Sequence, residues 1–595
     1  MGKMQNIILQ YKKLNDRIES RENSKAEREK VFKNIEEIAA DFSETYIKTF
    51  QKVLDASLPK LYDGINYDDS KVDLKELVKD NSVVLVPNHQ SHVDYLAINY
   101  MFYKSYKKPL YVAGGNNLNI FPIGKLFRKS GCFFIRRSFQ NDITYKLTLE
   151  AYLYYLLKEK KPIEFFFEGG RSRTGKLLPP RYGLYGMLLD AYQQLKEEEP
   201  ERKLYFVPVS IAHEYVPEQK SLAKELGGAK KKKESTTQLF GLFKLFAYQF
   251  GSVHIKCGEP IKVMDYNSEN LKSFTQDLAF QCFRRVGKNM MVTPTSLLAL
   301  ILLDEATGAM TWQDIINNAK AILEYCNKFD VPITDSLKDD KCQPSLERAM
   351  DILVGNKRIN VIGREHHGTL YYSIREECRQ EILYFKNTIL HHFLVPSIIS
   401  YAWINLFNGG IVNVQDLKDF FLEQRNQLKH EFYLPTVKQF FLTTLKVISD
   451  AIGRKVESLE DMMELSHKEL YAIASKVGIF TRALSYINEG YYASALTVRS
   501  LMKEYPEGFK MDSFNKKVKS VFEAEKELGR VIRYSESFSL PLTKNSIKYM
   551  GHQNLLNFED GHYKVDDSEK LDSLINSYEK GLTDQLTFNF RAPSL

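Results

Sequence analysis

Short apolar segments alternate with longer amphipathic ones over residues 76–265, and this alternation is the main pattern in the chain. Helix-like stretches separate the short segments. Each short segment is rich in β-branched or aromatic residues and has the length of a buried strand. They cover residues 83–86, 109–112, 132–135, 162–167, 204–209 and 253–257. Strands that alternate with helices predict an α/β domain with a mainly parallel sheet.

The sequence on both sides of this α/β region has a helical pattern. Residues 1–75 interleave charged and apolar side chains, and residues 266–595 carry few strand signals. Asn408-Gly409-Gly410 marks an expected turn between two of the later helices. We therefore predict a helical N-terminal region (1–75), an α/β domain (76–265) and a large, mostly α-helical C-terminal domain (266–595).

Composition narrows the class of protein. Of 595 residues, 44% are hydrophobic and 27% charged, which is typical of a folded protein. The longest apolar runs, such as residues 296–303, are far shorter than the roughly 18 residues of a membrane span, and residues 1–30 contain no signal peptide pattern. Six scattered cysteines without a CxxC pair indicate a reducing compartment and no structural zinc. A net charge of +8 permits an anionic substrate or membrane surface but does not require nucleic acid.

The most informative polar residues lie in the stretch NHQSHVD, residues 88–94. His89 follows an apolar strand and Asp94 begins a helix-like pattern, so the histidine lies in a strand-to-helix turn. On one continuous helix the two side chains would point about 140° apart, so they pair only if His89 is in the turn. An imidazole oriented by a carboxylate can act as general base toward a hydroxyl. The alternative is a structural turn histidine, as we interpret His92, next to an aspartate favoured by the helix dipole.

Two arginines, Arg136 and Arg137, directly follow the predicted strand at 132–135. The ends of such strands are where α/β folds bind ligands. The guanidinium fork suits a phosphate monoester. Because adjacent strand residues point to opposite faces, we expect one arginine to reach the site. The alternative for either arginine is a solvated or salt-bridged side chain.

The next cluster nearly matches a nucleotide-binding loop. Gly170 to Lys176 has the spacing G-x-x-x-x-G-K after a strand. However, Leu177 occupies the position of the hydroxyl that would bind magnesium. Pro179-Pro180 then interrupts the helix that such a loop requires. We therefore predict no nucleotide site here.

The same stretch suits an anionic ligand. Its glycines let the backbone approach a ligand, while Arg171, Arg173 and Lys176 are expected to form a cationic wall. Glu168 would order those cations or hold a substrate hydroxyl. A basic surface loop is the alternative. A fourth cluster, the strand at 206–210, contains Pro208, which we expect at a strand end or sheet edge because it donates no backbone hydrogen bond.

Taken in order, these clusters resemble the four sequence blocks of the glycerolipid acyltransferase superfamily. His89 to Asp94 is similar to the H-x4-D block, and the other blocks correspond to 133–137, 167–173 and 207–210, all within about 120 residues. The wording NHQSHVDY and FIRRSF, with the passages 228–237 and 384–393, most resembles bacterial membrane-associated glycerol-3-phosphate acyltransferases and the related dihydroxyacetone-phosphate acyltransferases. The resemblance is firm over 80–265 and looser over 266–595.

The resemblance implies an activity and residue roles. His89 would take the proton from the sn-1 hydroxyl of glycerol 3-phosphate as it attacks the thioester of acyl-CoA or acyl-carrier protein, and Asp94 would orient the imidazole. No covalent acyl-enzyme, metal or cofactor is implied. The expected substrate-binding residues are Arg137, Glu168, Gly169, Arg171, Ser172, Arg173 and Pro208. Alternatives are dihydroxyacetone phosphate as acceptor, or a non-catalytic lipid- or partner-binding scaffold.

A lipid product implies contact with a membrane, and residues 230–250 are the candidate segment. Four lysines precede apolar residues at 239, 242, 243, 246 and 250, which share one helical face. A basic run beside an amphipathic helix is the interfacial pattern. We therefore expect peripheral attachment to the cytoplasmic side of the cell membrane, without a transmembrane helix. The alternatives are a core helix with a solvated loop, or lysines that contact an acidic acyl carrier protein.

Overall fold

A computed structural model describes residues 2–119, 123–139, 141–228, 250–266, 269–305, 308–363, 368–531 and 535–587. These residues form two compact units. The first holds residues 2–172, 177–217 and 250–291. The second holds residues 173–176, 218–228 and 292–587. The short stretch 173–176 therefore packs with the C-terminal helices, although the residues on both sides of it belong to the first unit.

The first unit is built on one sheet. Its order is β1-β7-β6-β2-β5-β3-β4, with β8 also paired to β6. All pairs are parallel except those that β6 makes with β7 and β8. This confirms the predicted α/β class with a mainly parallel sheet. The strands are β1 (Gly64–Asp68), β2 (Ser82–Pro87), β3 (Tyr111–Gly115), β4 (Cys132–Ile135), β5 (Ile163–Glu164), β6 (Leu204–His213), β7 (Ser252–Cys257) and β8 (Ile261–Lys262).

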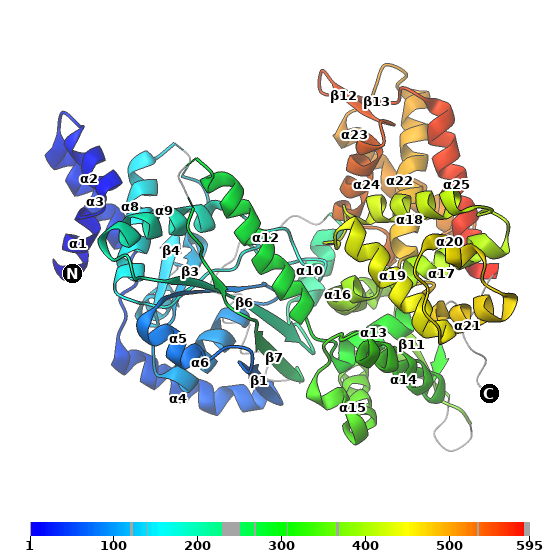
Figure 1. Ribbon diagram of the computed structural model, residues 1–595, viewed down its shortest axis with the longest axis horizontal. Coiled ribbons are helices and arrows are strands. Elements are labelled where there is room, and N and C mark those ends of the chain that lie inside the picture. Colours follow the sequence, from blue (N-terminus) through cyan, green and yellow to red (C-terminus); the bar gives the residue numbers. More distant parts are fainter. Residues whose placement is uncertain are drawn as a thin grey trace. The chain divides into compact units, whose positions relative to one another are not determined.

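Helices cover both faces of this sheet (Figure 1). The connection from β2 to β3 runs in the opposite direction along the sheet from those that join β4 to β5 and β5 to β6. Right-handed crossovers therefore put α6 on one face and α8 with α9 on the other. The helices of this unit are α1 (Gly2–Leu9), α2 (Lys12–Glu19), α3 (Ser24–Ile38), α4 (Glu44–Leu61), α5 (Leu74–Asp80), α6 (Asp94–Tyr106), α7 (Ile123–Lys129), α8 (Ile143–Lys158), α9 (Gly183–Glu198) and α12 (Leu271–Asn289).

The strands differ from the predicted segments where the chain approaches the end of the sheet. β5 is only two residues long, and the Phe165 N–H makes a further bond to the Leu85 carbonyl, so Phe166 and Phe167 leave the ladder earlier than predicted. β6 is longer than predicted: it pairs with β2 as far as Pro87↔Val209 and then runs on to His213. Residues 64–68, predicted as helical, form β1 and pair with β7.

The prediction for Pro208 was wrong about its place in the sheet. β6 is an interior strand between β2 and β7, not an edge strand. On the side away from β2, β6 pairs with β8 at residues 205–206 and with β7 from Val209 onward. Pro208 lies between these two ladders, where the partner strand changes. Its carbonyl accepts a hydrogen bond from the Gly258 N–H at 2.8 Å.

The described part of the second unit is mostly helical, as predicted for the C-terminal region. The apolar run near 296–303 forms α13 (Pro294–Leu303), every residue of which is buried. The predicted turn at residues 408–410 is confirmed between α17 and α18. The other helices are α10 (Gln219–Leu226), α14 (Trp312–Lys328), α15 (Cys342–Gly355), α16 (Arg379–Ile389), α17 (Leu394–Phe407), α18 (Val414–Leu428), α19 (Val437–Ile452), α20 (Leu459–Met463), α21 (His467–Val477), α22 (Ser485–Glu504), α23 (Met511–Glu527), α24 (Leu540–His552) and α25 (Ser568–Thr587).

Short strands complete the second unit. β9 (Met310–Thr311), β10 (Ile359–Ile362) and β11 (Tyr371–Ile374) form an antiparallel sheet. β12 (Asn557–Glu559) and β13 (His562–Lys564) form a hairpin. These strands are minor additions to a helical framework.

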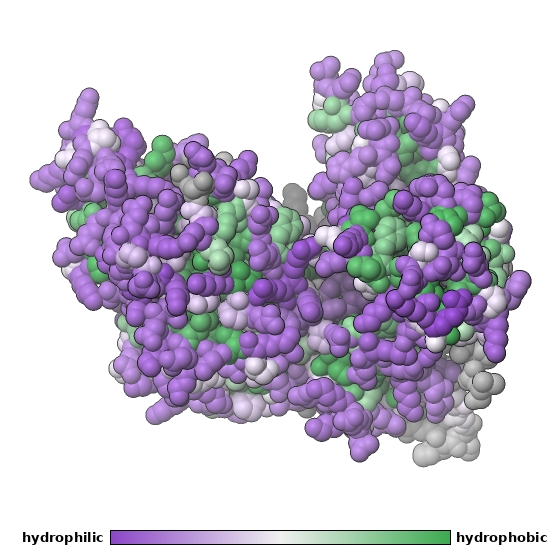
Figure 2. Space-filling model, viewed as in Figure 1, coloured by the Kyte–Doolittle hydropathy of each residue, from purple (hydrophilic) through white to green (hydrophobic). Residues whose placement is uncertain are grey.

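The visible face of the molecule is mostly hydrophilic, with hydrophobic residues in small patches (Figure 2). Within the described residues, no single helix has both the length and the apolar composition to cross a membrane; one pair, Glu376–His392 and Leu394–Phe407, passes together but is bent by 85°. The expected membrane-contact segment, residues 230–250, lies outside the described residues apart from Phe250.

Candidate active site

His89 and Asp94 are brought together by a tight turn at the carboxyl end of β2. The strand ends at Pro87, and Asp94 is the first residue of α6. His89 Nδ1 lies 2.8 Å from Asp94 Oδ2. The same oxygen accepts hydrogen bonds from the N–H groups of Gln90 at 2.6 Å and Ser91 at 2.9 Å. The predicted arrangement, with the histidine in the turn and the aspartate in the first helical turn, is therefore the one observed.

A second histidine shares the same carboxylate. His213, the last residue of β6, has Nε2 2.6 Å from Asp94 Oδ1. Neither His213 nor Asp94 exposes its side chain to solvent, whereas the His89 side chain is 14% exposed. Asp94 thus joins a buried histidine to one that can meet a ligand.

Hydrogen bonding keeps Asp94 ionised despite its burial. Burial by itself raises the pKa of the carboxyl, but the hydrogen bonds from His213 and His89 outweigh it and hold the pKa well below its ordinary value. An ionised carboxylate only accepts hydrogen bonds. The proton of the neutral His89 ring is therefore on Nδ1, which leaves a lone pair on Nε2. Among the described residues, Nε2 has no hydrogen-bond partner.

The main chain and ring of His89 are fixed by the loop that follows β5. The ring stacks on Phe166, with centroids 4.1 Å apart. The Ser172 N–H donates to the His89 carbonyl at 2.9 Å. The His89 N–H donates to Glu168 Oε1 at 3.3 Å. The third sequence block therefore contacts the first one directly.

The pKa values of two other buried carboxyls near Asp94, those of Glu164 and Glu168, are shifted in the opposite direction. Burial raises the pKa of Glu164 and of Glu168 well above the ordinary value, and the negative charge of Asp94 raises both further. The His89 N–H partly opposes this effect at Glu168. The pKa of Asp94 is thus lowered while the pKa values of Glu164 and Glu168 are raised. Divergent pKa values of this kind are typical of catalytic sites.

The two arginines after β4 have different surroundings. Arg136 is paired with Glu37, through Nε at 2.8 Å, and with Asp142 through Nη1 at 3.2 Å, and it lies over the Tyr145 ring. Arg137 is exposed, and within the described ranges it has no hydrogen bond or ion pair. Arg136 is thus the salt-bridged member of the pair, and a ligand-binding role for Arg137 stays a prediction.

The remaining predicted residues lie along the loop from Gly169 to Arg173. Gly169 has a φ of +68°, and its N–H donates to the Phe166 carbonyl, which makes a tight turn that favours glycine. Arg171 and Ser172 belong to the first unit, and Ser172 is buried. Arg173 belongs to the second unit, where its Nε donates to Glu225 at 2.7 Å. Two members of the expected cationic wall are therefore already paired with carboxylates, Arg173 with Glu225 and the buried Lys176 with Glu431.

Sequence analysis missed two residues of this site, His213 and Phe166. His213 follows the apolar strand at 204–209, and polar residues after a strand were the signal that identified Arg137. Phe166 lies between Phe165 and Phe167, whose side chains are almost fully buried. Alternation along the chain would have turned the middle ring away from the core. Both signals were present in the sequence.

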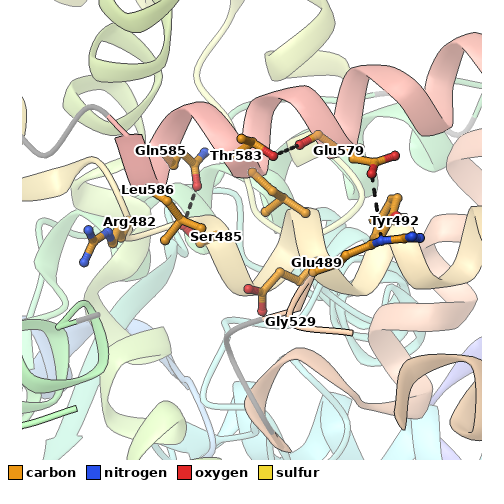
Figure 3. A pocket seen from close by; sticks show the side chains of 11 residues that line it. Arg482, Ser485, Glu489, Tyr492, Gly529, Glu579, Thr583, Gln585 and Leu586 are labelled. Atoms are coloured by element: carbon orange, nitrogen blue, oxygen red, sulfur yellow. Dashed lines mark hydrogen bonds and ion pairs between the residues drawn. The ribbon is translucent and has the colours of Figure 1, made fainter. Parts of the chain in front are cut away.

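A pocket in the second unit is separate from these residues. It lies between α22 and α25 and beside Gly529 (Figure 3). Ser485 donates to Gln585 at 2.6 Å across it, and Glu489 accepts from Ser537. These polar groups hydrogen-bond to protein partners and support helix packing. Elsewhere in the described chain, no group of three or more His, Cys, Asp or Glu residues is placed to bind a metal ion.

Comparison with known proteins assigns a class and a family. The family model described as "Acyltransferase" matches residues 69–212, which include His89, Asp94 and the loop after β5. Residues 69–212 are thus an acyltransferase domain. A second model, "Glycerol-3-phosphate acyltransferase C-terminal region", matches residues 222–559, more than half of the chain. The chain belongs to the glycerol-3-phosphate acyltransferase family, which confirms the resemblance found in the sequence.

Curated relatives are similar over much of the chain. The glycerol-3-phosphate acyltransferase of Pseudoalteromonas translucida (strain TAC 125) is 28% identical over 503 residues, which cover 81% of this chain and 59% of the relative. The protein of the same name from Pseudomonas aeruginosa (strain LESB58) is 32% identical over 387 residues, covering 61% of this chain and 44% of the relative. The chain spans less than two thirds of the length of these relatives.

Replacing Asp94 with asparagine is expected to destabilise the first unit. Asn offers one acceptor oxygen where four donors now converge, so at least one buried donor loses its partner. We expect Asp94→Asn to lower the free energy of unfolding by about 3 kcal/mol and the melting temperature by several degrees, measured by calorimetry at pH 7.

The difference in stability between wild type and Asp94→Asn should depend on pH. The pKa of Asp94 is lowered in the folded state, so its contribution is present above the unfolded pKa of about 3.9 and is lost as the pH falls toward the folded pKa. The gap between wild type and Asp94→Asn should therefore narrow below pH 4. Equal melting temperatures at pH 7 would contradict the proposed role of the carboxylate.

Proposed function

We propose that this chain is a glycerol-3-phosphate 1-O-acyltransferase that transfers a fatty acyl group from acyl-CoA or acyl-carrier protein to the sn-1 hydroxyl. The product would be lysophosphatidate, the first intermediate of phospholipid synthesis. The observation that carries this proposal is the His89–Asp94 pair in a family whose curated relatives are named glycerol-3-phosphate acyltransferases.

The proposed reaction uses His89 Nε2 as general base. Asp94 fixes the proton on Nδ1, and the stacked Phe166 ring limits rotation of the imidazole. Nε2 then removes the proton from the acceptor hydroxyl as its oxygen bonds to the thioester carbonyl carbon. The C–S bond breaks, and the imidazolium returns the same proton to the departing sulfur, so the donor leaves as a free thiol. The resulting imidazolium is stabilised by the Asp94 charge. The hydroxyl is itself the nucleophile, so no acyl-enzyme is required.

The acceptor phosphate is assigned to the arginines at the carboxyl edge of the sheet. Arg137 follows β4, and Arg171 follows β5 in the loop whose Ser172 bonds to the main chain of His89. Carboxyl ends of parallel strands share one edge, where α/β folds bind ligands. Glu168 and Gly169 support the turn of this loop. We also propose that the protein attaches to the cytoplasmic side of the membrane through residues 230–250.

A direct assay tests the activity and the base together. Wild type and His89→Ala receive radiolabelled glycerol 3-phosphate, dihydroxyacetone phosphate or lysophosphatidate, each with acyl-CoA or acyl-carrier protein. We expect labelled lysophosphatidate from glycerol 3-phosphate with wild type. Loss of general-base assistance should lower kcat of His89→Ala at least about 100-fold, while circular dichroism at the assay temperature still shows a folded protein.

Each other outcome of that assay has a specific meaning. Faster acylation of dihydroxyacetone phosphate would reassign the acceptor. A folded wild type that acylates none of the three would favour the scaffold alternative and overturn the enzyme proposal. Near-wild-type turnover by a folded His89→Ala protein would remove His89 from the mechanism.

The neighbouring arginines provide a matched pair of variants. Arg137→Ala removes an exposed guanidinium that has no hydrogen bond or ion pair with the residues the structure describes, so stability should not change. Its loss should raise the KM for glycerol 3-phosphate about 10- to 100-fold, as expected for a lost charged hydrogen bond. Arg136→Ala breaks the contacts with Glu37 and Asp142 and should leave that KM within about twofold. The reverse pattern would assign the phosphate to Arg136.

His213 is expected to support turnover through Asp94. His213→Phe leaves Asp94 Oδ1 without its donor, so the carboxylate holds the His89 ring less firmly. We expect kcat to fall about tenfold, a loss of roughly 1.4 kcal/mol, with little change in KM. The control is His254→Phe, because His254 is also buried against a carboxylate, Glu214, at 3.3 Å. Equal effects of the two variants would show that His213 contributes only to folding.

A further inference from the structure

The loop after β5 is divided between the two units within a few residues. Phe166, Glu168 and Ser172 contact His89 and belong to the first unit. The next four residues, Arg173–Lys176, belong to the second unit. A single peptide bond therefore separates the residue that bonds to the His89 carbonyl from a segment built into the C-terminal helices.

The first two residues of that segment are bound by helices of the second unit. The Arg173 side chain donates to Glu225 of α10 at 2.7 Å. The Asn387 side chain, on α16, donates to the Thr174 carbonyl at 2.8 Å. The Tyr486 hydroxyl donates to Asn387 Oδ1 at 2.7 Å, which fixes the orientation of the amide. One side-chain contact and one main-chain contact thus hold the start of the segment.

Gly175 lets the segment pass close to α16. Its φ is +82°, a left-handed conformation that favours glycine. A Cβ at this position would lie 2.0 Å from the Tyr384 carbonyl oxygen, which is backbone and cannot rotate away. The close approach therefore requires glycine, and it brings the following residue into the interior of the second unit.

Lys176 ends the segment in a buried ion pair. Its ammonium group is paired with Glu431, and the two side chains are only 9% and 2% exposed. The ammonium group also lies over the rings of Phe432 and Tyr486, at 4.8 and 5.4 Å from their centroids. The Tyr491 hydroxyl donates to Glu431 at 3.0 Å. Charge, aromatic faces and a hydrogen bond all constrain the position of this one lysine.

A buried ion pair of this kind fixes position more than it adds stability. Desolvation of two charges offsets much of their attraction, so apolar residues of similar size would serve packing equally well. Removing one partner, however, leaves an unpaired charge that must escape to solvent or move. Lys176 is in the same loop as Ser172 and Arg171, so a shift of its main chain would move that loop as well.

We propose, on the basis of the function proposed above, that Lys176 and Glu431 are positioning residues for the acceptor site. They anchor Arg173–Lys176 in the helical C-terminal unit, and this anchor holds Ser172 against the His89 carbonyl and Arg171 in register for the acceptor phosphate. The C-terminal helices thereby contribute to acceptor binding without supplying a group that touches the substrate.

Glu431→Gln in the full chain tests this anchor. The substitution keeps the shape of the side chain but removes the negative charge of Glu431 from its ion pair with Lys176. We expect the KM for glycerol 3-phosphate to rise at least tenfold while the KM for the acyl donor stays within twofold. Amide hydrogen exchange of residues 166–178 should become at least tenfold faster. If the ion pair only stabilised the fold, Glu431→Gln would not raise the KM for glycerol 3-phosphate relative to that for the acyl donor. It would also not speed the exchange of residues 166–178 more than that of other residues.

A second buried ion pair in the same unit provides the control. Arg379 and Glu536 are 5% and 2% exposed, and Arg379 donates to Glu536 at 2.7 and 2.6 Å. Glu536→Gln should lower the melting temperature much as Glu431→Gln does, but leave the KM and the exchange of 166–178 unchanged. If Glu431→Gln does not fold, Lys176→Gln replaces it with the same expectations, because it removes the ammonium group that anchors the segment and leaves the Glu431 charge without that partner.

The KM measurement depends on the proposed function, whereas the amide exchange measurement does not, so the two proposals can fail separately. If wild type lacks acyltransferase activity, the exchange experiment still decides the anchor, because it needs no substrate. Faster exchange confined to the Glu431 variant supports the anchor. Equal behaviour of the Glu431 and Glu536 variants, or exchange of 166–178 at the wild-type rate in the Glu431 variant, overturns it.

Discussion

The Asp94 carboxylate accepts four hydrogen bonds while it exposes no side-chain surface, and the geometry of the site depends on it. Two bonds come from main-chain N–H groups and two from histidines. A buried charge is costly unless it is paired and fully hydrogen-bonded. The turn between β2 and α6 and the extension of β6 supply those donors. Stabilising this one charge therefore also fixes the tautomer and orientation of His89.

This requirement explains why the site needs strands from distant parts of the sequence. β2 and β6 are neighbours in the sheet, and β6 continues beyond the last residue paired with β2 until it reaches His213. β5 stops early on the other side of β2, which frees the following loop to stack Phe166 on His89. β6 and β5 lie on opposite sides of β2. The extension of β6 places His213 against Asp94, and the early end of β5 places Phe166 against the His89 ring. The parallel sheet thus positions groups that are far apart in the chain.

The sequence predicted the class of fold and the pair at the centre of the site because both depend on local pattern. Alternating apolar segments gave the α/β domain, and H-x4-D at a strand-to-helix turn gave His89 with Asp94. It did not predict His213 or the pairing of Lys176 with Glu431, which lies 255 residues further along the chain. Such contacts depend on how separate elements pack, and this packing cannot be read from the local pattern of a single sequence. Pro208 was misplaced for a related reason, because two partner strands meet along one side of β6.

The near match to a nucleotide-binding loop has a structural explanation. Gly175 and Lys176 occupy positions where a P-loop would wrap a phosphate and project its lysine toward it. Here the glycine permits close contact with the Tyr384 carbonyl, and the lysine is neutralised by a buried glutamate. Neither is available to a ligand in this arrangement. The passage 384–393, which supported the family resemblance, supplies Tyr384 and Asn387 to the same segment. The glycine-lysine spacing and the passage 384–393 therefore take part in the same packing. In it, the helical unit binds the end of the loop that reaches His89.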